Sequence, residues 1–277
     1  MTSTVLFIGS KPGEIEWNAA GFAALCRKGN ASVHFVSVTD GSKSHYERKY
    51  VQDPDALARR RYHEAKTSSE IIDAEYELMG LPEGEVFVNL ANSEEMIRLL
   101  RNTGPEGKGP DIVVTSRLGV GDRDQRYCSQ LVHDAFSMLR VASMCADTPY
   151  LERLPVLAYW GDDYVQGGAF RPDVRIDITP VIDKKCEMIA SFDSVVFEWM
   201  PWIKGMPETA PEDEAGRIAF VRSLLEEEQV KRHRSFDKGR DNPDPLIFVE
   251  WYQISEYGSC AGIDDFTAIY GNQSNDS

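Results

Sequence analysis

The feature that most constrains the fold is the alternation of short apolar runs with longer segments of helical periodicity. One unit lies within the first forty residues: an apolar run at 5–8, a Gly- and Pro-containing loop at 9–13, a predicted helix at 17–28 and a predicted strand at 32–38. Short apolar runs bounded by turn residues indicate buried strands, and the segments between them indicate crossover helices. The pattern predicts a mostly parallel sheet covered by helices on both faces.

The same alternation continues along the chain. The predicted helices cover 55–79, 94–101, 127–145, 181–200 and 212–233, and the predicted strands cover 111–115, 156–159, 174–178 and 246–249. Residues 76–78, at the end of the first of these helices, have an alternative prediction as strand. A Pro- and Gly-rich turn is predicted at 238–245, and the polar tail from residue 271 is expected to fray. We therefore expect one α/β domain over residues 1–277, with a C-terminal extension from about residue 205.

Composition narrows the function classes. The 277 residues carry a formal net charge of −15, which repels phosphate backbones and anionic lipid, so neither a nucleic-acid partner nor a membrane is expected. No apolar run approaches the roughly 18 residues of a membrane span, and the opening residues 1–10 are interpreted as a first strand, not a signal peptide. The five cysteines show no C-x-x-C spacing, which favours a reducing cytoplasm over disulfides or a thiolate zinc site.

The functional face is expected at the carboxyl ends of the strands, where the loops of a parallel sheet converge. Two loops follow strongly apolar strands, one around Pro12 and one around Asp122. These two loops are predicted to meet, and the candidate site is placed there.

An ordered set of segments resembles the PIG-L/LmbE family of zinc-dependent N-deacetylases. The matching segments are IGSKPGEIEW at 8–17, VSVTDG at 36–41, RYHEA at 61–65, LPEG at 81–84, the strand and loop at 111–132, FRPD and IDI within 170–178, and FVEWYQISEYG at 248–258. The resemblance spans nearly the whole chain and implies a Rossmann-like three-layer fold and, in an intact member, removal of an acyl group from an amino sugar.

The residues that carry the family's chemistry are replaced in the first loop. The family has a His-Pro-Asp-Asp loop, in which the His and the second Asp bind zinc and the first Asp is the general base. By that resemblance, Lys11 stands at the first ligand, Gly13 at the base and Glu14 at the second ligand. An ammonium binds no cation until it loses its proton, and glycine has no side chain to accept one.

The second loop is altered as well. The resemblance aligns Asp122 with the first His of an H-P-D-H segment and Gln125 with the last ligand, while Asp124 is retained. The resemblance therefore implies that the family zinc has been lost, and no cofactor is expected. Lys11, Glu14, Asp122 and Asp124 are the candidate catalytic residues, and the Lys11 ammonium is predicted to neutralise the three acids in the metal's place. The alternative is that these four side chains are simply solvated.

Several other residues are candidates for ligand contact. Arg61 resembles the family's substrate-contacting Arg, although a helical i,i+3 ion pair with Glu64 is an equal alternative. The remaining candidate ligand-binding residues are Glu64, Arg117, Gln125 and Arg126. His45 and His63 lie in charged segments and are expected to be solvated. Because the five histidines are dispersed along the chain, no histidine-based metal cluster is predicted.

Three functions remain open. The first is a non-catalytic pseudo-deacetylase that binds a sugar-like or N-acyl ligand, or an active paralogue. The second is a metal-independent or re-purposed hydrolase or transferase on an amide substrate, using Lys11 with Glu14, Asp122 or Asp124. The third is a hydrolase in which the acids hold a harder ion such as Mg²⁺ or Mn²⁺. The family resemblance also implies a homo-oligomer.

Overall fold

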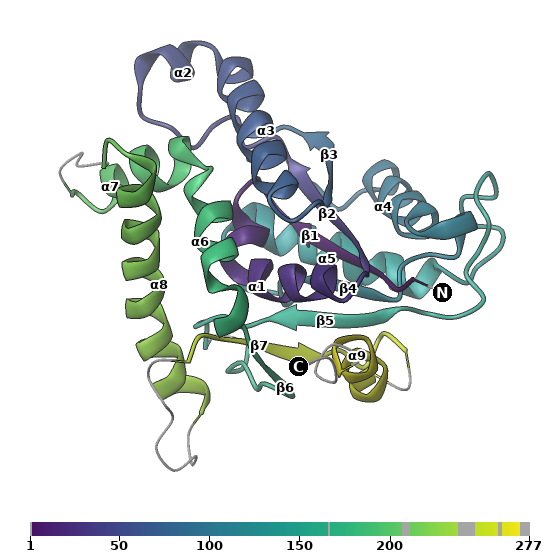
Figure 1. The fold of residues 1–277 in the computed structure, drawn as a ribbon. Coiled ribbons are helices and arrows are strands. Elements are labelled where there is room, and N and C mark those ends of the chain that lie inside the picture. Colours follow the sequence, from purple (N-terminus) through teal and green to yellow (C-terminus); the bar gives the residue numbers. More distant parts are fainter. Residues whose placement is uncertain (1, 166, 207–210, 238–246, 260–261, 272–277) are drawn as a thin grey trace.

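The computed structural model describes residues 2–165, 167–206, 211–237, 247–259 and 262–271, and these contain one seven-stranded sheet with helices on both faces (Figure 1). The strands are β1 Thr4–Gly9, β2 Ser32–Thr39, β3 Glu75–Leu81, β4 Ile112–Thr115, β5 Val156–Trp160, β6 Val174–Asp177 and β7 Val249–Ile254. The helices are α1 Glu14–Lys28, α2 Arg48–Gln52, α3 Pro54–Glu70, α4 Leu90–Asn102, α5 Arg123–Met138, α6 Ile182–Ala190, α7 Met200–Ile203, α8 Glu214–Phe236 and α9 Gly262–Gly271. Short 3₁₀ turns, η1 Pro105–Gly107 and η2 Thr179–Val181, and a π-helical segment, η3 Asp193–Trp199, complete the list.

The sheet order is β3-β2-β1-β4-β5-β7-β6, and the prediction of a mostly parallel α/β sheet is confirmed. The five strands from β3 to β5 are parallel, whereas β7 runs antiparallel to both of its neighbours. Since β7 lies between β5 and β6, the C-terminal part of the chain completes the same sheet. No helix in the described ranges is both long and apolar enough to cross a membrane.

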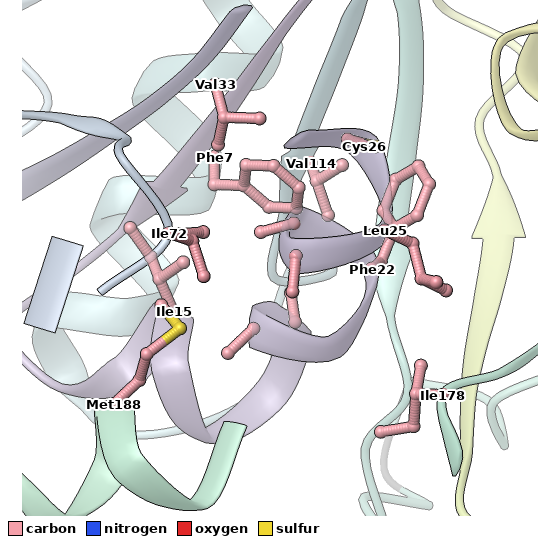
Figure 2. Close-up of a cluster of buried hydrophobic side chains, with 14 of the residues drawn as sticks. Phe7, Ile15, Phe22, Leu25, Cys26, Val33, Ile72, Val114, Ile178 and Met188 are labelled. Atoms are coloured by element: carbon pink, nitrogen blue, oxygen red, sulfur yellow. The ribbon is translucent and has the colours of Figure 1, made fainter. Parts of the chain in front are cut away.

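Alternation along the central strand β1 divides the interior into two layers. Phe7 faces one cluster, with the apolar side of α1 and with α6, whereas Ile8 faces the other, with α4 and α5. Figure 2 shows the first cluster, in which Phe22 of α1 lies beside Phe7 and Met188 of α6 lies beside Ile15. Both faces of β1 are buried, which is why its sequence is a continuous apolar run and not an alternating one.

Three predicted helices end earlier than their periodicity indicates. The helix predicted over 55–79 ends at Glu70, because Asp73 turns the chain with φ +53°, and the alternative prediction of a strand at 76–78 is correct. The helix predicted over 127–145 ends at Met138. There the buried guanidinium of Arg101 donates hydrogen bonds to the carbonyl oxygens of Met138 and Val141, both at 3.0 Å. These carbonyl groups therefore need no backbone N–H donors from a further turn of helix.

The helix predicted over 181–200 is broken into α6, η3 and α7. The backbone N–H of Ser194 donates to Glu64 Oε1 at 2.9 Å instead of to a carbonyl of its own helix. A side chain inserted into the ladder of backbone bonds interrupts an α-helix. The turn predicted at 238–245 and most of the tail from residue 271 lie outside the described residues.

Candidate functional site

The two predicted loops meet at the carboxyl end of the sheet. Lys11, between β1 and α1, places its Nζ 2.8 Å from Asp122 Oδ2, in the loop between β4 and α5. The side chains of Lys11 and Asp122 are 31% and 48% exposed, so the pair lies at the rim and not on a buried floor. The predicted salt bridge is therefore present, and both of its side chains are partly exposed to solvent.

Local backbone geometry positions both residues. Gly13 has φ +92° at the N-terminus of α1, a conformation that strongly favours glycine and lets the chain turn directly after Pro12. At the other loop, Asp122 caps α5 by accepting the N–H of Gln125 at 3.0 Å. The Gln125 side chain reaches back to the Asp122 N–H at 2.8 Å, which completes a capping box.

Glu14, the first residue of α1, is buried. One carboxylate oxygen accepts both the backbone N–H and the hydroxyl of Ser10 at 2.5 Å, and the other accepts Gln125 Nε2 at 2.8 Å. Burial raises the pKa of Glu14, although Ser10, Lys11 and Gln125 work in the opposite direction. The Glu14–Gln125 bond ties the first loop to the second loop independently of Lys11.

The ion pair changes the titration of both partners. Although burial acts against it, the attraction to Asp122 raises the pKa of Lys11 above its ordinary value. Likewise, burial opposes the shift at Asp122, yet the Lys11 ammonium lowers the pKa of this carboxyl. Lys11 therefore remains an ammonium at neutral pH and does not act there as a base.

Asp124 does not take part in this cluster. Its carboxylate accepts the backbone N–H of Gly84, and it lies 3.2 Å from Arg123 Nη1. The expectation that Lys11 neutralises all three acids is therefore corrected for Asp124, which fastens the β3–α4 connection to the start of α5.

Arg61 and Glu64 are buried and are bonded to other protein groups. Arg61 donates to the carbonyl oxygens of Gly41 at 2.5 Å and Ser44 at 2.7 Å. Glu64 accepts both the N–H and the hydroxyl of Ser194, at 2.9 and 2.6 Å. In the described part of the chain the ion pair of Glu64 is with Arg60, at 3.2 Å, and not with Arg61. These bonds hold the loop after β2 and the η3 segment together behind the site.

The other two candidate arginines are also engaged. Arg117 forms a bidentate pair with Asp162, at 2.7 and 2.8 Å, and donates to the carbonyl of Gly168 at 3.0 Å. Arg126 donates to the carbonyl of Gly121 at 2.8 Å. Arg117 thus braces the segment after β5, and Arg126 braces the loop that carries Asp122.

Beside Gln125 lies a cavity of about 300 Å³, open at the carboxyl end of β4 and β5. Its polar and aromatic lining includes Asn18, Gln125, Trp160, Asp162, Tyr164 and Arg232. Of the predicted site residues, Gln125 lines it directly. A cavity of this size suits a ligand of about one ring.

The donor atoms near Lys11 do not fit a zinc ion. Both oxygens of Glu14 accept hydrogen bonds, the amide oxygen of Gln125 accepts the Asp122 N–H, and Asp122 is paired with an ammonium. A zinc site needs about three free nitrogen, sulfur or carboxylate donors and no neighbouring cation. In this arrangement the side chains at this position are bonded to one another.

Reasoning from the sequence missed a second polar cluster. His45 is buried, contrary to the expectation that it is solvated, and its Nε2 lies 2.9 Å from Glu198 Oε2. Together with Glu47, these residues place three possible ligand atoms within 4.8 Å of one another. However, the guanidinium of Arg60 donates to both carboxylate oxygens of Glu198, each at 2.7 Å. A metal ion at this cluster would have to displace that guanidinium.

Glu83 was also missed as a partner of the site. It accepts the N–H groups of Lys43 and Ser44, both at 2.8 Å, and lies 3.6 Å from Arg61 Nη1. The L-P-E-G sequence around Glu83 predicts a sharp turn. It does not predict that Glu83 contacts Lys43, Ser44 and Arg61.

Comparison with known proteins agrees with this fold. Residues 6–136 match the family model described as "PIG-L: GlcNAc-PI de-N-acetylase". No curated protein sequence gives a match. The matched range contains both loops of the candidate site, whereas β5 to β7 and α6 to α9 lie beyond it.

Solved structures extend the likeness over most of the chain. N,N'-diacetylchitobiose deacetylase from Pyrococcus horikoshii is 17% identical, with a TM-score of 0.68, covering 92% of this chain and 84% of its own. The 4-carboxy-2-hydroxymuconate hydratase GalB from Pseudomonas putida KT2440 is 15% identical, with a TM-score of 0.66, covering 91% and 96%. The A40926 pseudoaglycone deacetylase Dbv21 is 13% identical, with a TM-score of 0.58, covering 94% and 100%. Residues 6–136 are therefore similar to the PIG-L family model, and the chain has the fold of these structures over most of its length.

Proposed function

We propose that this chain is a non-catalytic member of the PIG-L/LmbE family, which binds a small sugar-like or N-acyl ligand in the cavity beside Gln125 and does not hydrolyse it by zinc chemistry. The observation that carries the proposal is the 2.8 Å contact between Lys11 Nζ and Asp122 Oδ2. It puts a fixed positive charge where the family keeps its first metal ligand, and a second cation there would meet several kcal/mol of repulsion at about 4 Å.

The hydrogen bonds of Glu14 support the same proposal. Its two oxygens are occupied by Ser10 and Gln125, so the acid at the family's second ligand position has a structural task. Gly13, at the position of the family's base, has no side chain, and its φ of +92° makes any replacement strained.

One observation favours a second candidate, an enzyme that works by acid and base without a metal. The pKa of Glu14 is raised by burial, as in general acids. The fold also occurs in a protein named as a hydratase, GalB. Against this candidate, Lys11 is held as an ammonium by Asp122, and Glu14 is only 8% exposed. We therefore place it second.

The test begins with metal analysis of purified protein, followed by a deacetylase assay on N-acetylglucosamine with added zinc, magnesium or manganese. We expect less than stoichiometric metal and no released acetate. Ligand-observed NMR with the same sugar should show weak binding to the wild-type protein. About one tightly held metal per chain, or metal-dependent turnover, would contradict the proposal.

A gain-of-site variant sharpens the test. Lys11→His, Glu14→Asp and Gln125→His together restore the family's three ligand types, and Gly13 is left unchanged because of its backbone conformation. If the two loops are arranged as described, this variant should bind zinc, whereas Lys11→Met with the other two positions unchanged should not. A well-folded triple variant that ignores zinc would show that the site cannot be reached by these side chains.

A further inference from the structure

The cavity beside Gln125 is closed by parts of the chain beyond the family match. Asn18 and Gln125 come from α1 and α5, but Trp160 ends β5 and Arg232 lies on α8. The region matched by the family model ends at residue 136. The selectivity of this cavity therefore depends on residues that the family model does not include.

Among the described residues, the guanidinium of Arg232 has one ion pair. Its side chain is 11% exposed, and its Nη2 lies 2.5 Å from Glu228 Oε1. Its Nε is buried and has no hydrogen-bond partner among the described residues. Arginine offers five N–H donors, and because Arg232 lines the cavity, a bound group can contact its guanidinium.

Two acids line the cavity with Arg232, namely Asp162 and the exposed Asp163, and neither forms an ion pair with it among the described residues. Asp162 is held by Arg117 through two bonds, at 2.7 and 2.8 Å, and is therefore already neutralised. Glu228 is 22% exposed and contributes one contact. The remaining donors of Arg232 suit a planar, negatively charged group with two oxygens.

We propose that the ligand of this cavity carries a carboxylate, which Arg232 binds, and that the apolar part of the ligand packs near the indole of Trp160. This inference rests on the proposed function only for the existence of a ligand in the cavity, not for the loss of zinc. Small carboxylates, such as an acidic sugar or an N-acyl amino acid, form the ligand class. A neutral amide of the same shape lacks the charge that Arg232 needs.

The test compares two probes that differ in one group. Isothermal titration calorimetry with D-glucuronate and D-glucuronamide measures the contribution of the carboxylate at constant ring shape. We expect the wild-type protein to bind glucuronate at least about tenfold more tightly, the effect of one charge-assisted hydrogen bond. Equal affinity for the two probes, or no binding of glucuronate, would overturn the inference.

Three variants locate the effect. Arg232→Met should abolish the preference for glucuronate, while Arg234→Met, on the exposed side of the same helix, should leave it intact. Glu228→Gln removes the competing carboxylate, so affinity for glucuronate should rise about two- to fivefold. A purely structural Arg232 would not produce that rise. Circular dichroism melts show whether each variant is folded.

The outcomes also separate this inference from the proposed function. Stoichiometric zinc together with an Arg232-dependent preference would refute the proposed function and leave the inference standing. Binding of N-acetylglucosamine without any preference for the carboxylate would do the reverse.

Discussion

Lys185 Nζ lies 2.7 Å from Glu250 Oε1, and both side chains are almost fully buried, at 5% and 2% exposure. The same carboxylate accepts the backbone N–H groups of Gly21 and Phe22 in α1, at 2.9 and 2.8 Å. A single carboxylate on β7 therefore joins α6 to α1. In this way the C-terminal strand is fastened to the helix that begins at the candidate site.

The first prediction concerns this pair. Lys185→Met should lower the free energy of unfolding by about 3–5 kcal/mol, because it leaves a buried carboxylate without its counter-charge. Urea denaturation at pH 7 measures the loss. The matched control is Lys184→Met, whose side chain is 51% exposed and pairs with Glu187 at the surface. Equal stability of the two variants would show that the carboxylate is satisfied by its other donors alone.

The second prediction concerns Lys11. Because its pair with Asp122 is partly exposed, Lys11→Met should cost only about 1 kcal/mol or less, well below the loss expected for a buried pair. The pKa of Asp122 is lowered from its ordinary value of 3.8, so the pair contributes stability above that pH and loses it as the pH falls through the folded-state pKa.

At high pH, the stability that this pair contributes depends on the protonation of Lys11, whose pKa is raised above 10.5. The contribution of the ammonium is complete below that value and is lost only above it. Thermal melts of wild type and Lys11→Met should therefore differ at pH 7 and converge near pH 2. Lys231→Met, an exposed lysine on α8, is the control. A difference that persists unchanged in acid would mean that charge is not the cause.

The third prediction concerns Glu16, buried between α1 and α3. Burial raises its pKa from 4.5 to about 7, although hydrogen bonds, among them one from Ser68 Oγ at 3.3 Å, act in the opposite direction. The folded state therefore binds this proton more tightly than the unfolded state, and stability falls as the pH rises from 4.5 to 7. Glu16→Gln should remove that loss and gain up to about 3 kcal/mol over wild type at pH 8.

Urea titrations at pH 5 and pH 8 measure the effect of Glu16→Gln. The gain should be small at the lower pH and large at the higher pH. Glu70→Gln, on the exposed end of α3, should show neither. A variant that is destabilised at both pH values would indicate that the ionised carboxylate is needed for capping α1.

The fourth prediction concerns Arg101, which is fully buried and donates to several carbonyl groups after α5. Arg101→Lys keeps the charge but loses the planar set of donors, and several carbonyl oxygens are then left without a partner. We expect a loss of about 2–4 kcal/mol, given about 1–3 kcal/mol for each unsatisfied group. Arg98→Lys, on the same helix and 36% exposed, is the control.

Hydrogen exchange locates the damage in Arg101→Lys. Protection should fall first in residues 138–148, the segment whose carbonyl groups Arg101 holds. Uniform loss across the sheet would instead indicate a general packing defect.

Much of the sheet could be predicted from the chain alone. Runs such as residues 5–8 and 112–115 are apolar because both faces of a central parallel strand are buried. Burial of this kind can be predicted from residue type alone. The meeting of the Lys11 and Asp122 loops follows from the same pattern, since the carboxyl ends of adjacent parallel strands share one edge.

The partners of individual polar side chains could not be predicted in this way. Asp124 and Asp122 are two residues apart, yet one turns to Gly84 and the other to Lys11. The break after α6 depends on Glu64, which lies 130 residues before Ser194. Such bonds form between groups that the fold brings within about 3 Å of each other. The spacing of residues along the sequence does not show which distant groups these are.

The sequence by itself therefore determined the layers, the order of most elements and the edge at which the site lies, because hydrophobic periodicity acts locally along the chain. Only the tertiary structure decided that Lys11 is a rim residue, that Arg61 is bonded to backbone carbonyls, and that Arg232 from α8 lines the cavity. Burial and hydrogen-bond partners belong to the folded arrangement, in which residues far apart in sequence share one small volume.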